Sequence, residues 1–183
     1  MKPVLSTART HLVVLQPEHA ALLLNYYSAN QAHLAQWEPE RSARFYTLAY
    51  WQSTAKQNVA AQKAGSALHC AATTPDFSEV VGVCNLTNIA YGVFQACHLG
   101  YSIAEAHQGV GLMTEIVDAC VSYAFSDLGL HRVMANHMPA NTRSERLLKK
   151  LGFEREGLAK SYLKINGRWE DHVLTAKINP TNT

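Results

Sequence analysis

The stretch that decides the fold reads Tyr101-Ser102-Ile103-Ala104-Glu105-Ala106-His107-Gln108-Gly109-Val110-Gly111-Leu112-Met113. It predicts an apolar strand that runs into a turn with glycines, out of which a long amphipathic helix begins. The helix is expected because apolar residues recur at the spacing of one buried helical face: Leu112, Met113, Ile116, Val117, Cys120, Val121, Ala124, Phe125 and Leu128. Gly129 then predicts the end of this helix.

A helix that begins on a glycine turn offers a place for an anion. Its first N–H groups have no partner within the helix, and its dipole puts positive charge at the same end. Glycines also let a phosphate come close to the backbone, so the segment is typical of phosphate binding. An ordinary connection between a strand and a helix is the alternative. Two phosphate motifs are excluded, because Leu112-Met113 replaces the Lys and Ser or Thr of a P-loop and Thr114 replaces the third glycine of a dinucleotide fingerprint.

Regular elements are predicted on both sides of this stretch, without a repeat or linker. Strands are expected at residues 11–15, 67–73, 79–88, Ala96–Ile103 and Arg132–His137, and helices at residues 18–29 and 43–63. Asn166-Gly167 predicts a hairpin between the strand-like runs 156–160 and 165–174. Helices interspersed with sequential strands indicate an α+β, or mixed α/β, layered fold. The length of 183 residues fits a single domain over 1–183.

A second informative segment has the pattern of a capped helix. It reads Asn141-Thr142-Arg143-Ser144-Glu145-Arg146-Leu147-Leu148-Lys149-Lys150-Leu151-Gly152-Phe153. Asn141 is a good N-cap, and Glu145 complements the dipole in the first turn. Lys149 and Lys150 complement the other end, and Gly152 predicts the stop. All of these features are compatible with a purely structural role.

Together, these two segments resemble the acetyl-CoA site of the GNAT superfamily of N-acetyltransferases. Gln108-Gly109-Val110-Gly111 resembles its pyrophosphate loop, and Asn141-x-x-Ser144 followed by Leu151-Gly152-Phe153 resembles the other half of the site. The resemblance implies a curved mixed sheet that splays open beside acetyl-CoA as co-substrate, without a metal. It also implies a set of cofactor-binding residues: Tyr101, Ser102, Ile103, Gln108, Gly109, Val110, Gly111, Leu112, Met113 and Asn141. Met113 departs mildly from the family, which usually has a small residue there.

Both ends of the chain are similar to the RimJ/RimL branch of that superfamily, and closer to the RimJ type. The resemblance rests on Trp37-Glu38-Pro39 and on the C-terminal hairpin. It implies transfer of an acetyl group to the N-terminal α-amine, alanine above all, of a ribosomal protein. Trp37, Glu38 and Glu40 are the candidate substrate-binding residues. A relative that acetylates an antibiotic, a polyamine or an amino acid, and a non-catalytic relative that only binds CoA, are the alternatives.

The resemblance also suggests how the reaction is catalysed. Ser144 is the candidate acid that protonates the departing thiolate, because related enzymes use the matching serine for this step. Other relatives use a tyrosine one helical turn later, where this chain has Leu148. A structural cap is the alternative for Ser144. The positions where relatives carry a basic glutamate hold Asn136 and Leu163, which cannot take a proton.

The sequence therefore does not assign the general base that deprotonates the amine. An α-amine has a pKa of about 7.7–8.0, against about 10.4 for lysine, so a useful fraction is neutral near pH 7 without a strong base. Glu38, Glu40 and His137 are candidates to attract the amine or relay its proton, and surface or structural roles are the alternative.

Composition narrows the compartment and the partners. A net charge of +2 without a basic run gives no reason to expect nucleic-acid binding. The four cysteines form no Cys-x-x-Cys pair and are expected to be buried free thiols. The nine histidines show no ligand spacing, so no metal site is expected. No signal peptide or membrane span is predicted, and we expect a cytoplasmic protein that is a monomer or homodimer.

Overall fold

The computed structural model describes residues 1–181. Its strands and helices, where η marks a short 3-10 helix, follow in this order: β1 (Leu5–Ser6), β2 (His11–Val13), η1 (Pro17–His19), α1 (Ala20–Ala29), α2 (Gln31–Leu34), η2 (Ala43–Tyr46), α3 (Leu48–Lys63), β3 (Leu68–Thr73), β4 (Val80–Ala90), β5 (Ala96–Ile103), η3 (Glu105–His107), α4 (Leu112–Ser126), β6 (Arg132–His137), α5 (Thr142–Lys150), β7 (Glu154–Ile165) and β8 (Arg168–Ile178).

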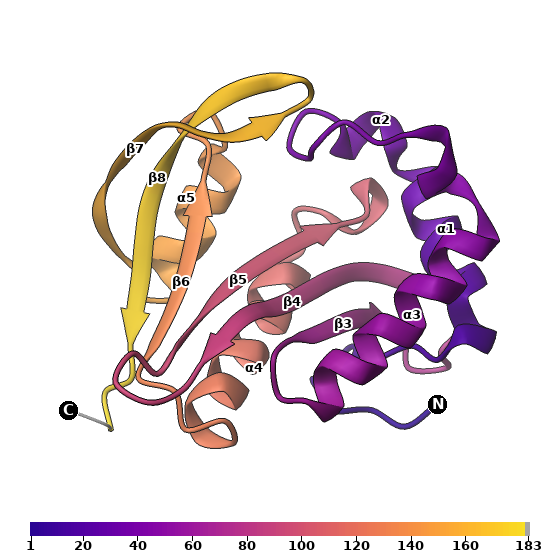
Figure 1. The fold of residues 1–183 in the computed structure, drawn as a ribbon, viewed down its shortest axis with the longest axis horizontal. Coiled ribbons are helices and arrows are strands. Elements are labelled where there is room, and N and C mark those ends of the chain that lie inside the picture. The colour runs from indigo at the N-terminus through magenta and orange to yellow at the C-terminus, as the bar shows by residue number, and fades with distance from the viewer. Residues whose placement is uncertain (182–183) are drawn as a thin grey trace.

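The strands form one curved sheet of eight strands in the order β1-β2-β3-β4-β5-β6-β8-β7 (Figure 1). Neighbouring strands run antiparallel, except β5 and β6, which run parallel. A parallel pair needs a crossover, and α4 supplies it between β5 and β6. This mixed arrangement confirms the predicted α+β fold class.

Each face of the sheet has its own hydrophobic core. On one face α4 buries the predicted stripe, with Ile116 and Val117 fully inaccessible, and α5 adds Leu148. On the other face α1 and α3 bury Tyr26 and Trp51 against the strands. The four cysteines are buried and free, as predicted. No helix in the described part of the chain is both long and apolar enough to cross a bilayer.

The sheet opens between its two central parallel strands. The pairing of β5 with β6 covers only the steps from Ala96↔Arg132 to His98↔Met134, and then the strands diverge, as Figure 1 shows. Residues 99–103 of β5 pair with β4 on one side only. At the far end of the opening, the β7–β8 hairpin reaches over to the segment after α2, where Asn166 N–H donates to the Glu38 carbonyl at 3.0 Å.

The structure differs from the sequence prediction in a few elements. The predicted helix 43–63 is interrupted at Thr47, where the backbone is extended. The Thr47 side chain caps α3 by accepting a hydrogen bond from Tyr50 N–H. The predicted strand 156–160 is part of a longer β7, which continues through a bulge between Ala159 and Leu163. The short elements β1 and α2 were missed because two and four residues carry too little periodicity.

Candidate functional site

The glycine turn before α4 leaves the start of that helix open. Gly109 and Gly111 have φ of 78° and 77°, a left-handed conformation that costs an L-residue strain. Gly111 is the N-cap, and no side chain caps the first turn of α4. A Cβ at Gly109 would meet nothing within 4 Å, so the backbone conformation is what requires glycine there. The result is a helix N-terminus without a side-chain cap, whose free N–H groups and dipole suit the predicted anion.

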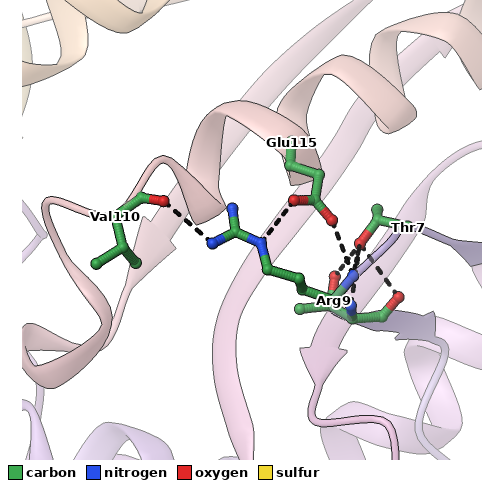
Figure 2. A network of polar contacts seen from close by, with 5 residues as sticks. Thr7, Arg9, Val110 and Glu115 are labelled. Carbon is green, nitrogen blue, oxygen red and sulfur yellow. Dashed lines mark hydrogen bonds and ion pairs between the residues drawn. The ribbon is translucent and has the colours of Figure 1, made fainter.

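An arginine from the N-terminal segment holds this turn from outside. Arg9 donates from Nη1 to the Val110 carbonyl at 3.1 Å and from Nε to the Glu115 carboxylate at 2.9 Å. Figure 2 shows its guanidinium lying between these two groups. Hydrogen bonds hold the pKa of Glu115 below its ordinary value; the bond from Thr7 has the largest effect, and those from Arg9 add to it. Arg9 therefore ties the glycine turn to the first turn of α4.

The side chain of Gln108 joins the turn to helices on both sides. Its Nε2 lies 2.8 Å from His33 Nε2 on α2, and its Oε1 accepts from Arg143 on α5. Arg143 is exposed and brings a second guanidinium beside the glycine turn. Sequence reasoning missed both arginines and His33, because only the fold brings residues so distant in sequence together.

The exposed edge of β5 carries the predicted strand residues of the site. Tyr101 points toward α5, where its hydroxyl oxygen lies 2.7 Å from Ser144 Oγ. Ser102 points to the opposite face, with its Oγ 2.9 Å from the Tyr26 hydroxyl. Burial raises the pKa of Tyr101 above its ordinary value, so its phenol keeps its proton at neutral pH. The contact between Tyr101 and Ser144 spans the opening between β5 and the segment after β6.

Asn141 caps α5, as the sequence predicted. Its Oδ1 accepts from Ser144 N–H at 3.1 Å, which also fixes the backbone of that serine. The Ser144 hydroxyl is turned to Tyr101. Asn141 thus fills the capping role that was the alternative for Ser144, and the serine hydroxyl faces the opening instead.

Two of the three candidate substrate-binding residues line a cavity of about 150 Å³ under the hairpin tip. Glu38 and Glu40 form part of its wall with Tyr46 and Asn166, whereas Trp37 lies outside this lining. Glu38 is paired with Arg41 at 3.0 Å, so its charge is partly neutralised.

A larger cavity of about 240 Å³ lies between α1, α3 and strands β3 and β4. It shares Tyr27 and Arg41 with the first cavity, and its floor includes Asn85, which pairs with Gly100 on β5. Trp51 also lines it, and the indole Nε1–H of Trp51 is buried without a hydrogen-bond partner among the described residues.

Neither the two positions where relatives carry a basic glutamate nor the candidate His137 offers an evident base. Asn136 Nδ2 lies 3.5 Å from the Tyr162 hydroxyl, which it can reach only weakly. His137 is buried, with Nδ1 3.0 Å from the Met138 carbonyl. Leu163 is exposed and pairs with Glu170 across the hairpin. Within residues 1–181, no group of three His, Cys, Asp or Glu side chains could hold a metal ion.

Comparisons with known proteins identify the family of this chain. The family described as "Acetyltransferase (GNAT) domain" matches residues 9–154. The [Ribosomal protein uS5]-alanine N-acetyltransferase of Escherichia coli is 43% identical over 176 residues, which is 96% of this chain and 91% of that protein.

Two solved structures extend the likeness to the fold. The ribosomal-protein-S5-alanine acetyltransferase of Vibrio fischeri superposes with a TM-score of 0.93 at 36% identity, over 98% of both chains. The structure described as Mycobacterium smegmatis RimJ in complex with CoA-disulfide superposes with a TM-score of 0.85 at 27% identity, over 94% of this chain and 86% of that one. The chain therefore belongs to the GNAT family of acetyltransferases.

Proposed function

We propose that this protein transfers the acetyl group of acetyl-CoA to the N-terminal alanine of ribosomal protein uS5. The observation that carries the proposal is the 43% identity, over nearly the full length, to the E. coli enzyme named for that reaction. The glycine turn, the open edge of β5 and the Ser144 hydroxyl supply the matching chemistry.

The donor would occupy the opening between β5 and β6. Its pyrophosphate would lie on the bare N-terminus of α4, held by backbone N–H groups from Gly109 to Met113. Arg143 would add positive charge nearby. The pantetheine arm would run along residues 99–103 of β5, whose backbone groups on that side have no strand partner.

The acceptor would approach from the side of α1 and α3. The two cavities there share Tyr27 and Arg41, and Asn85 on the floor of the larger one is the neighbour of Gly100. Gly100 leaves open space above the strand, because a Cβ there would meet nothing within 4 Å. An extended peptide can therefore bring its amine to the thioester beside Tyr101 while its following residues lie in the cavities.

The transfer itself would be a direct attack. The neutral amine attacks the thioester carbonyl, the C–N bond forms and the C–S bond breaks. The departing thiolate takes a proton from Ser144, and the proton that the amine releases replaces it on the serine. At pH 7 roughly a tenth of an α-amine is neutral, against less than about a thousandth of a lysine side chain, which suits a site without an evident base.

The test is a panel of acceptors with acetyl-CoA and purified protein, followed by release of the free thiol. The panel holds peptides that begin with Ala, Ser or Leu, an N-blocked Ala peptide with a lysine, and spermidine. We expect the Ala peptide to have the highest kcat/KM and the blocked peptide to be inert. Preference for spermidine or lysine would replace the proposal with a small-amine or lysine acetyltransferase, and acetyl-CoA binding without thiol release on any acceptor would leave only a CoA-binding protein.

A further inference from the structure

The hydroxyls of Tyr101 and Ser144 meet across the opening, and this contact was not predicted from the sequence. Tyr101 lies three residues beyond the last β5 residue that pairs with β6, and Ser144 lies in the first turn of α5. Their oxygens are 2.7 Å apart, a typical distance for one hydroxyl donating to another. The contact therefore joins the two halves of the site at the point where the reacting thioester would lie.

The direction of this hydrogen bond decides what the serine can do. Each hydroxyl has one proton to donate and lone pairs to accept. If Ser144 donated to Tyr101, its proton would be occupied and turned away from the opening. If Tyr101 donates, Ser144 Oγ is the acceptor and its own proton stays free for another group. Both hydroxyls carry their protons at neutral pH, and a phenol is more acidic than an aliphatic alcohol and hence the better donor, which favours Tyr101 as the donor to Ser144.

The backbone alone does not orient the serine hydroxyl. Asn141 fixes the Ser144 N–H, but a serine side chain still has three staggered rotamers about χ1. A donor that is held in a packed strand selects one of them. Tyr101 is such a donor, because its ring packs against the core on the α4 face of the sheet.

We propose that Tyr101 is a positioning residue for acetyl transfer: its phenol donates to Ser144 Oγ and so aims the serine proton at the departing sulfur. As that proton moves to sulfur, the phenol O–H stabilises the negative charge left on Oγ. The proton released by the attacking amine then restores the serine. This role rests on the proposed function of the site, but only on the binding of acetyl-CoA as acetyl donor. It therefore applies to any amine acceptor.

The test is a double-mutant cycle of Tyr101→Phe and Ser144→Ala, with thiol release measured on the best acceptor. Phenylalanine keeps the buried ring and removes only the hydroxyl. We expect Tyr101→Phe to lower kcat roughly tenfold with KM for acetyl-CoA within about twofold of wild type. In the Ser144→Ala background the same change should have no further effect on kcat, because the tyrosine acts through the serine.

Tyr26→Phe is the matched control. It removes a hydroxyl that bonds Ser102 on the opposite face of the same strand, and its kcat should stay near wild type. Tyr101→Phe with a kcat equal to that of Tyr26→Phe would overturn the positioning role. So would an equal loss with and without the Ser144 hydroxyl. A wild-type protein that acetylates no amine would instead overturn the proposed function itself.

Discussion

Replacing Gly111 by alanine separates the two reasons for a glycine at the start of α4. The backbone there has φ of 77°, and a left-handed residue with a Cβ costs about 1–2 kcal/mol. Alanine also lowers the conformational entropy of the unfolded chain, which stabilises the folded state by about 0.4–1 kcal/mol. The new Cβ would meet only Arg9 Nη2, at 4.0 Å, so crowding adds little. We expect a net loss of about 1 kcal/mol in the free energy of unfolding, which lowers Tm by about 2–4 °C.

The binding effect of Gly111→Ala should exceed this stability effect. The Cβ would lie beside the first N–H groups of α4, where a phosphate must approach closely. We expect the Kd for acetyl-CoA to rise at least about tenfold, or about 1.4 kcal/mol. Isothermal calorimetry measures the Kd, and thermal unfolding of the same sample measures the stability.

Gly129→Ala is the matched control for this experiment. Gly129 also has a positive φ, of 64°, and a Cβ there meets nothing within 4 Å, but it follows the other end of α4. The control should lose a similar Tm while keeping the wild-type Kd. If both variants bind acetyl-CoA like wild type, or if both lose affinity equally, the glycine turn is not the phosphate site.

Three further predictions follow from the same contacts. Ser144→Ala should lower kcat on the order of 10²-fold with little change in the Kd for acetyl-CoA, and wild-type turnover would remove it from the chemistry. Asn141→Ala should lower the free energy of unfolding by about 1 kcal/mol in denaturant titration, because α5 loses its cap; an unchanged midpoint would contradict that role. Glu115→Gln should destabilise the protein at pH 7. Because the folded pKa of Glu115 is depressed, this difference should shrink as pH falls below its ordinary value of 4.5, and a difference constant down to pH 3 would count against it.

Local patterns predicted the parts of the site that are themselves local. The stripe after Gly111 and the cap at Asn141 need only residues within one helix, and both are present as expected. The break at Thr47 was missed although a capping residue was available in the sequence, because the periodicity continued across it.

The contacts that join distant segments could not be read from the sequence. Arg9 reaches Val110 across 101 positions, and Tyr101 reaches Ser144 across 43. Both pairs depend on which strands are neighbours and on where β5 leaves β6, and periodicity does not encode either. The cavity lined by Trp51 likewise arises from the packing of α3 on the sheet.

Mass spectrometry of intact ribosomal proteins tests the central claim most directly. The proteins are compared between the parent strain, a strain that lacks this gene, and the same strain complemented with wild type or with Ser144→Ala. The account predicts that uS5 loses one acetyl group in the deletion strain, regains it with the wild-type gene, and regains little with Ser144→Ala. A deletion strain whose uS5 keeps its acetyl group, or in which another molecule loses one instead, would contradict the account.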